Sequence, residues 1–290
     1  MPDSSISDLA VPRWEGAHQG PIRLGSPAHR DLFCRMLLDT FDPYKPQVIN
    51  WPKLDGDALA RLTSLPFWTI AVETEGHTAM RMQTIAECSD DPLIREAIAL
   101  NAFEERRHKE VLENMVRFYG IKIDPDENYQ RPNRPVWAYM NTGYGECFDS
   151  FFAFGLFKVA KDSGFFPKEL VDVFEPIIQE EARHILFFVN WAAYTQRREI
   201  LPLQPIYAVE RFVALVNKAR ERVKFAGSTS NNEMTMKGHE AMGIDLAPRR
   251  FMQLCLAEND RRMAHYDERL VRPTIMPRLV RLALPFMPKK

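Results

Sequence analysis

Residues 105–108 read Glu-Arg-Arg-His and residues 181–184 read Glu-Ala-Arg-His, so the spacing Glu-x-x-His occurs twice in this chain. On a helix, residues three apart lie on the same face, so each copy directs a carboxylate and an imidazole to one point. One further glutamate precedes each copy on the preceding helical segment, Glu75 for the first and Glu146 for the second. Four helices that each supply such side chains form a two-metal carboxylate site in a helical bundle.

The positions of these glutamates along the chain support a common site. In an antiparallel helix pair, two side chains meet at one height when they are equally far from the turn, at about 1.5 Å per residue. Glu75 and Glu105 each lie 15 residues from Asp90, the turn between the first two helices. The second pair of glutamates lies 18 and 17 residues from the turn at Gly164. The predicted metal ligands are Glu75, Glu105, His108, Glu146, Glu181 and His184.

The first ligand has a competitor on the same helix. The helical stripe through Glu75 is almost wholly apolar, whereas the stripe through Glu73 is mixed. A carboxylate on an apolar stripe faces the core, where a buried charge needs a partner such as a metal. We therefore prefer Glu75 and keep Glu73 or His77 as alternatives.

Other polar residues near the motifs have different expected roles. Asp149 and Asn101, one turn from a predicted ligand, could orient a ligand histidine through its free ring N–H, as outer carboxylates and amides do. An exposed or capping role suits them equally well. The polar neighbours expected to face solvent are Glu104, Arg106, Arg107 and Glu180.

The hydrophobic pattern divides the chain into three parts: an N-terminal arm at residues 1–56, a four-helix region at 57–200, and a C-terminal helical extension at 201–290. Strand patterns are nearly absent, so the predicted fold class is all-α. Proline and glycine mark the ends of most segments. The expected helices are His29–Thr40, Asp57–Cys88 with a break at Pro66, Pro92–Tyr119, Val136–Asp162, Lys168–Arg198, Ile206–Ala226, Asn232–Met242 and Pro248–Leu270.

The composition is that of an ordinary globular protein, with 46% hydrophobic and 27% charged residues among 290. The net charge of −1 gives no electrostatic reason to expect a nucleic-acid partner. The four cysteines are scattered, which indicates free thiols in a reducing compartment. The N-terminus lacks a secretory signal, and no apolar run is long enough for a transmembrane span. We therefore expect a cytoplasmic protein.

Two further stretches bear on binding. Aromatic residues crowd the third and fourth expected helices, where core packing is the preferred interpretation and a tunnel for an apolar or aromatic substrate is the alternative. The C-terminal stretch Met276–Lys290 is apolar with basic residues. It could touch a membrane surface, although its proline and short length favour docking onto the bundle. The aromatic residues are Phe148, Phe151, Phe152, Phe154, Phe157, Phe187, Phe188 and Trp191.

The ligand pattern resembles the ferritin-like superfamily of di-iron carboxylate proteins over roughly residues 57–198. The resemblance implies a ferritin-like four-helix bundle whose site holds two iron ions, with manganese or a mixed Mn/Fe pair as the alternative. It further implies that such a site activates O2. By this resemblance, Glu75 and His108 would hold one metal and Glu146 and His184 the other, with Glu105 and Glu181 between them.

Departures from particular superfamily members narrow the expected function. The chain is longer than a storage subunit needs at both ends, and it lacks the C-x-x-C pair of a rubredoxin-type iron. A resemblance to aryl-amine N-oxygenases would imply a further histidine near the second motif, but residue 177 is Ile. This difference weakens that particular assignment. We expect a di-iron oxygenase or oxidase that takes O2, electrons from a donor and a small apolar or aromatic substrate. The alternative is a ferritin- or rubrerythrin-like ferroxidase, and a homodimer is possible.

Overall fold

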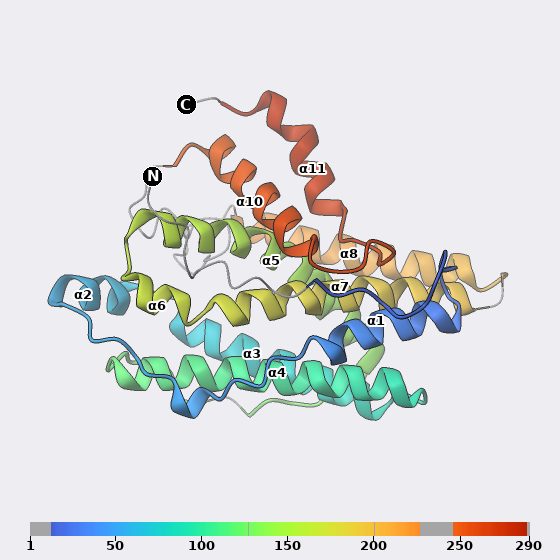
Figure 1. The fold of residues 1–290 in the computed structure, drawn as a ribbon, viewed down its shortest axis with the longest axis horizontal. Helices are drawn as coiled ribbons and strands as arrows, with labels where there is room; N and C mark the ends of the chain where they lie inside the picture. Colours follow the sequence, from blue (N-terminus) through green and yellow to red (C-terminus); the bar gives the residue numbers. More distant parts are fainter. Residues whose placement is uncertain (1–12, 127, 200, 227–245, 289–290) are drawn as a thin grey trace.

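The computed structural model describes residues 13–126, 128–199, 201–226 and 246–288. These residues form an all-helical molecule (Figure 1). Within the described ranges, the isolated bridge between Trp14 and Tyr266 is the single β-type pairing. The predicted fold class, all-α, is confirmed. The helices are α1 (Pro27–Asp39), α2 (Gly56–Ser64), α3 (Trp68–Glu87), α4 (Pro92–Phe118), α5 (Pro135–Ser163), α6 (Lys168–Asp172), α7 (Glu175–Arg198), α8 (Gln204–Ala226), α10 (Pro248–Met263) and α11 (Ile275–Ala283), with 3-10 turns at η1 (Pro46–Val48) and η2 (Leu284–Phe286).

Local sequence signals explain several helix ends. The side chain of Asp91 accepts hydrogen bonds from the first-turn amides of α4, and Pro92 follows it at the first helical position. Gly164 ends α5 in the left-handed conformation, with φ of 64°. The expected helix Asp57–Cys88 is interrupted near Pro66, as predicted, which gives α2 and α3.

Two expected helices differ from the structure. The segment Lys168–Arg198 forms two helices, α6 and α7, because Pro176 lacks the N–H that a continuous helix would need there and instead occupies the first turn of α7. The segment Pro248–Leu270 is helical only as far as Met263. The expected helix Asn232–Met242 lies outside the described residues.

The helices that carry the predicted ligands, α3, α4, α5 and α7, pack on one another. A short turn joins α3 to α4, which makes them a helical hairpin. The N-terminal region contributes to this core, because α1 packs against both α4 and α7 and buries Phe33, Met36 and Leu37. Figure 1 shows α1 running alongside α7, with α10 and α11 on the opposite side of the molecule from α3 and α4.

The aromatic residues of α5 and α7 are largely buried in the core, as the packing interpretation predicts. Phe187 and Phe188 of α7 belong to the same apolar cluster as Phe33 of α1 and Phe154 of α5. None of the helices in the described part of the chain has both the length and the apolar character that crossing a bilayer requires.

Candidate metal centre

Three helices bring four of the predicted ligands to one point. One ligand atom from each of Glu75 (α3), Glu105 and His108 (α4) and Glu181 (α7) lies within 4.8 Å of all the others. Nδ1 of His108 is 3.6 Å from a carboxylate oxygen of Glu75 and 3.2 Å from one of Glu181. This spacing allows the four side chains to hold one metal ion after small adjustments.

Glu75, rather than Glu73 or His77, belongs to this cluster. The ring of His77 instead packs edge-on against Tyr129, with ring centroids 4.9 Å apart. Burial and the contact with Asp126 raise the pKa of Tyr129, and the charge of Glu73 adds to this effect. The apolar stripe on α3 therefore indicated the residue that the structure places against His108.

The second Glu-x-x-His copy lies beside the first. Nδ1 of His184 is 2.8 Å from an oxygen of Glu105 and 4.0 Å from one of Glu181. The ring centroids of His108 and His184 are 5.7 Å apart. Glu105 and Glu181 thus each approach both histidines. Two carboxylates that lie between two metal ions, each ion held by one histidine, need this arrangement.

Glu146 approaches the same centre from α5. Both of its carboxylate oxygens are buried and accept no hydrogen bond from the described residues. Burial, with the neighbouring charge of Glu181 as the next cause, raises the pKa of Glu146 to about 8. A buried carboxylate without a hydrogen-bond donor is stable only when it is protonated or bound to a cation.

The charges at this centre fit two divalent cations. With both histidines neutral, six carboxylates face two guanidinium groups, which leaves four negative charges unbalanced. Two divalent ions would balance them, and oxygen and imidazole ligands suit Fe(II) or Mn(II). The groups counted are Glu75, Glu104, Glu105, Glu146, Glu180, Glu181, Arg107 and Arg183.

When no cation is bound, protons on the histidines and carboxylates balance the negative charge of the site. Burial alone would lower the pKa of His184, but the carboxylates of Glu105 and Glu104 raise it well above its usual value. Burial likewise acts against the charged form of His108, whereas its contacts with Glu180, Glu181 and Glu75 raise its pKa. Metal binding at this site is therefore expected to release protons.

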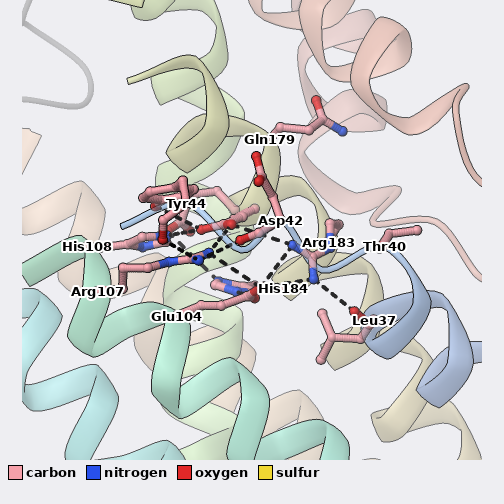
Figure 2. A network of polar contacts seen from close by, with 12 residues as sticks. Leu37, Thr40, Asp42, Tyr44, Glu104, Arg107, His108, Gln179, Arg183 and His184 are labelled. Atoms are coloured by element: carbon pink, nitrogen blue, oxygen red, sulfur yellow. Dashed lines mark hydrogen bonds and ion pairs between the residues drawn. The ribbon is translucent and has the colours of Figure 1, made fainter. Parts of the chain in front are cut away.

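Glu104 is buried, and the expectation that it faces solvent is wrong. Its carboxylate accepts a hydrogen bond of 2.8 Å from Nε2 of His184 and two of 3.1 Å from the guanidinium of Arg183. Burial would raise the pKa of Glu104, yet the charge of Arg183 and the contact with His184 lower it to about 2. Glu104 on one motif thus fixes the histidine of the other, as Figure 2 shows.

Glu180 makes the reciprocal contacts, so its predicted exposure is also wrong. It accepts a hydrogen bond of 2.8 Å from Nε2 of His108 and a short one from Arg107, which is buried as well. The hydroxyl of Tyr44 donates to Glu180 at 3.2 Å, and the ring of Tyr44 lies 3.8 Å from the Arg107 guanidinium carbon. Arg106 alone of the four predicted surface residues is exposed.

These contacts fix the orientation of both imidazoles. Because Nε2 of each histidine is held by a carboxylate, Nδ1 is left to face the ligand cluster. Neither Nδ1 has a well-aligned hydrogen-bond partner among the described residues. A histidine whose other ring nitrogen donates to a carboxylate is the form that binds a metal ion.

The N-terminal segment explains why the sequence prediction failed here. The carbonyl oxygen of Leu37, in the last turn of α1, accepts a hydrogen bond from Arg183. The carbonyl oxygens of Asp42 and Tyr44 accept from Arg107. Because α1 packs on α4 and α7, a second face of each of these two helices is buried.

A longer sequence repeat could have revealed these residues. Residues 104–108 and 180–184 both read Glu-Glu-x-Arg-His, so the first glutamate and the arginine recur along with the predicted ligands. Of the two residues considered for orienting a histidine, Asn101 is buried with its carbonyl oxygen unpaired, and Asp149 adds to the raised pKa of Glu146. The observed orienting groups are Glu104 and Glu180 instead.

The comparisons with known proteins add no assignment to this geometry. This chain matches no protein-family model, no curated protein and no solved structure. What the structure establishes, over the residues that it describes, is an all-helical fold with a largely buried group of glutamates and histidines that could hold a metal ion.

Proposed function

We propose that this chain is a ferritin-like di-iron oxidoreductase that uses O2 to oxidise a small apolar or aromatic substrate. The observation that carries the proposal is the convergence of six predicted ligands, four carboxylates and two imidazoles. In the protonation state that metal binding requires, with the histidines neutral and the carboxylates ionised, these ligands carry four negative charges. In a structural ion-pair network, arginines or lysines would neutralise these carboxylates directly, whereas here protons would have to balance them when no metal ion is bound. The excess negative charge at this site is the property that two divalent metal ions require.

The roles of the residues follow from their positions. Glu75 and His108 would hold one ion, and Glu146 and His184 the other. Glu105 and Glu181 would lie between the two ions, because each approaches both histidines. Two Fe(II) ions in this site would supply electrons for the reduction of O2.

The surroundings of the site suit an oxidation that excludes water. Phe188 and Tyr144, on α7 and α5, are buried and pack edge to face with ring centroids 5.0 Å apart. The hydroxyl of Tyr139 is buried without a hydrogen-bond partner among the described residues. Such an aromatic environment would favour an apolar substrate, and an external donor would return the electrons.

The test is the consumption of O2 by anaerobically loaded protein. We expect the Fe(II) protein to consume O2 and, with a reductant present, to oxidise members of a panel of small aromatic and aliphatic compounds. The variants Glu105→Ala and Glu181→Ala should lose this reaction, whereas Glu113→Ala, on the outer part of α4, should retain it. Substrate oxidation that proceeds equally in all three variants would overturn the proposal.

Partial exposure of two ligands supports a ferroxidase as the second candidate. The side chains of Glu75 and Glu181 are 20% and 17% exposed, whereas Glu105 and both histidines are nearly inaccessible. Iron could therefore enter and leave beside α3 and α7. A ferroxidase would oxidise many Fe(II) ions per chain without an organic substrate, whereas the proposed enzyme would stop near two.

A further inference from the structure

The C-terminal segment concentrates positive charge in a nearly neutral protein. No acidic residue follows Glu268, although the whole chain has a net charge of −1. The six basic residues of this segment are Arg269, Arg272, Arg278, Arg281, Lys289 and Lys290. Helix α11 lies in the middle of the segment, and Arg278 and Arg281 are both exposed on it.

Helix α11 has two apolar faces, and only one of them is used for packing. Pro277 and Val280 are buried, and Val280 packs in a cluster with Phe151 of α5 and Phe251 of α10. Arg249 of α10 also donates a hydrogen bond of 2.7 Å to the carbonyl oxygen of Leu284, just after α11. These contacts fix the helix on the molecule with a defined orientation.

The opposite face of α11 is apolar and exposed. Ile275, Leu279, Leu282 and Phe286 are 41%, 54%, 71% and 89% exposed. At 100° per residue Ile275, Leu279 and Leu282 of α11 fall within an arc of about 60° and form a stripe about 10 Å long, and Phe286 of the 3-10 turn η2 adds an exposed aromatic side chain after it. Figure 1 shows α11 at the outer edge of the molecule, on the side away from α3 and α4.

We propose that this stripe, together with Phe286, binds the surface of an anionic lipid bilayer. A helix with an apolar face and flanking arginines lies in the plane of a bilayer, with the apolar side chains among the acyl chains and the cations at the headgroups. Arg278 is exposed on one flank of the stripe, within reach of lipid phosphates, whereas Arg281 lies further round the helix and pairs with Asp260 of α10 at 2.8 Å. The helix lies on the bilayer and does not span it.

The positive charge of the segment favours an anionic bilayer, rather than a second copy of the chain, as the partner of the stripe. Asp260 and Asp267 pair with Arg281 and Arg269, but Arg278 beside the stripe forms no ion pair with an acidic residue in the described part of the chain. Two copies that met through the stripe would bring the two Arg278 side chains together, and like charges oppose such a contact. The exposed apolar residues of α8 provide a contrast. Phe212 is 65% exposed, but its neighbours Glu210 and Arg211 have opposite charges. The charge beside Phe212 therefore gives no preference for an anionic or a cationic partner.

The test is co-sedimentation with vesicles of phosphatidylcholine, with and without about one third phosphatidylglycerol. We expect binding to the anionic vesicles that weakens as salt is raised, because salt screens the attraction between the arginines and the lipid phosphates. Leu282→Ser with Phe286→Ser should weaken binding by roughly tenfold or more, since both side chains are exposed and leave the packed face intact. Arg278→Gln should weaken binding to the anionic vesicles by about fivefold.

Phe212→Ser serves as the matched control, because it removes another exposed aromatic side chain, 65% exposed, from a different helix. It should leave vesicle binding unchanged, and all variants should keep the metal content of the parent protein. Failure to bind anionic vesicles, or equal binding by the Leu282→Ser, Phe286→Ser variant, would overturn the proposal. A dimer that this variant dissociates would instead assign the stripe to a contact between protein chains.

Discussion

The contact between Glu104 and the opposite motif gives a prediction whose size the structure allows us to estimate. Glu104→Gln keeps the shape of the side chain but removes its charge and replaces one acceptor oxygen by an NH2 donor. In the protein, one oxygen accepts from Nε2 of His184 and the other accepts two hydrogen bonds from Arg183. The amide can satisfy only one of these two partners, because its nitrogen would face a second donor.

Two measurable losses follow from this mismatch. Breaking a buried charged pair by removing one partner costs about 3–5 kcal/mol, and we expect a value near 3 kcal/mol because the amide oxygen still accepts one set of bonds. Loss of the carboxylate that orients a ligand histidine lowers metal affinity by about 10- to 100-fold. The weakened ion should be the one held by His184, on the helix opposite the mutated residue.

The assays are urea unfolding of the metal-free protein and anaerobic titration with Fe(II). Glu113→Gln is the matched control, because Glu113 lies on the same helix and pairs with Lys109 near the surface. Partly exposed pairs of this kind contribute less than about 1 kcal/mol. The reasoning is refuted if Glu104→Gln unfolds and binds both metal ions as Glu113→Gln does.

Two other predictions concern stability. Gly143→Ala should destabilise the protein by about 1–3 kcal/mol in urea unfolding, because its Cβ would lie 2.2 Å from a ring carbon of Phe188. Gly56→Ala, which meets no atom within 4 Å, is the control, and equal unfolding of the two variants would contradict this packing argument. The hydrogen bonds from Arg269 lower the pKa of Asp267 to about 2 in the folded protein, so this carboxylate stabilises the fold above its unfolded pKa of about 3.9. The stability difference between the parent and Asp267→Asn should therefore shrink as the pH falls from about 4 toward 2, and a difference that is constant with pH would contradict the assignment.

Local patterns predicted the helices well because their ends depend on nearby residues. Asp91 caps α4 through the amides of residues two and three positions later, and Gly164 ends α5 through its own backbone conformation. The apolar stripe on α3 likewise identified Glu75 as the carboxylate that lies against His108. At the helix ends the decisive interactions lie within about one turn of the chain, and the stripe that identified Glu75 lies within one helix.

The missed features depend on contacts between distant segments. Glu104 and Glu180 looked exposed because each lies beside the stripe of its own helix that faces the other helices. Their burial results from α1 and the residues up to Tyr44, which are more than 50 residues away along the chain. No helical pattern in residues 29–44 indicates where that segment packs, so the sequence of the motif helices alone could not reveal it.

The measurement that tests the central claim most directly is the metal content of the purified protein after anaerobic loading with Fe(II) and removal of unbound ions. The proposed site predicts two iron ions per chain in the parent protein and in Glu113→Ala. It predicts fewer than two in Glu105→Ala and in Glu181→Ala, since each of these carboxylates lies between the two positions. A parent protein that binds no iron, or a Glu105→Ala variant that still binds two ions, would contradict a two-metal centre.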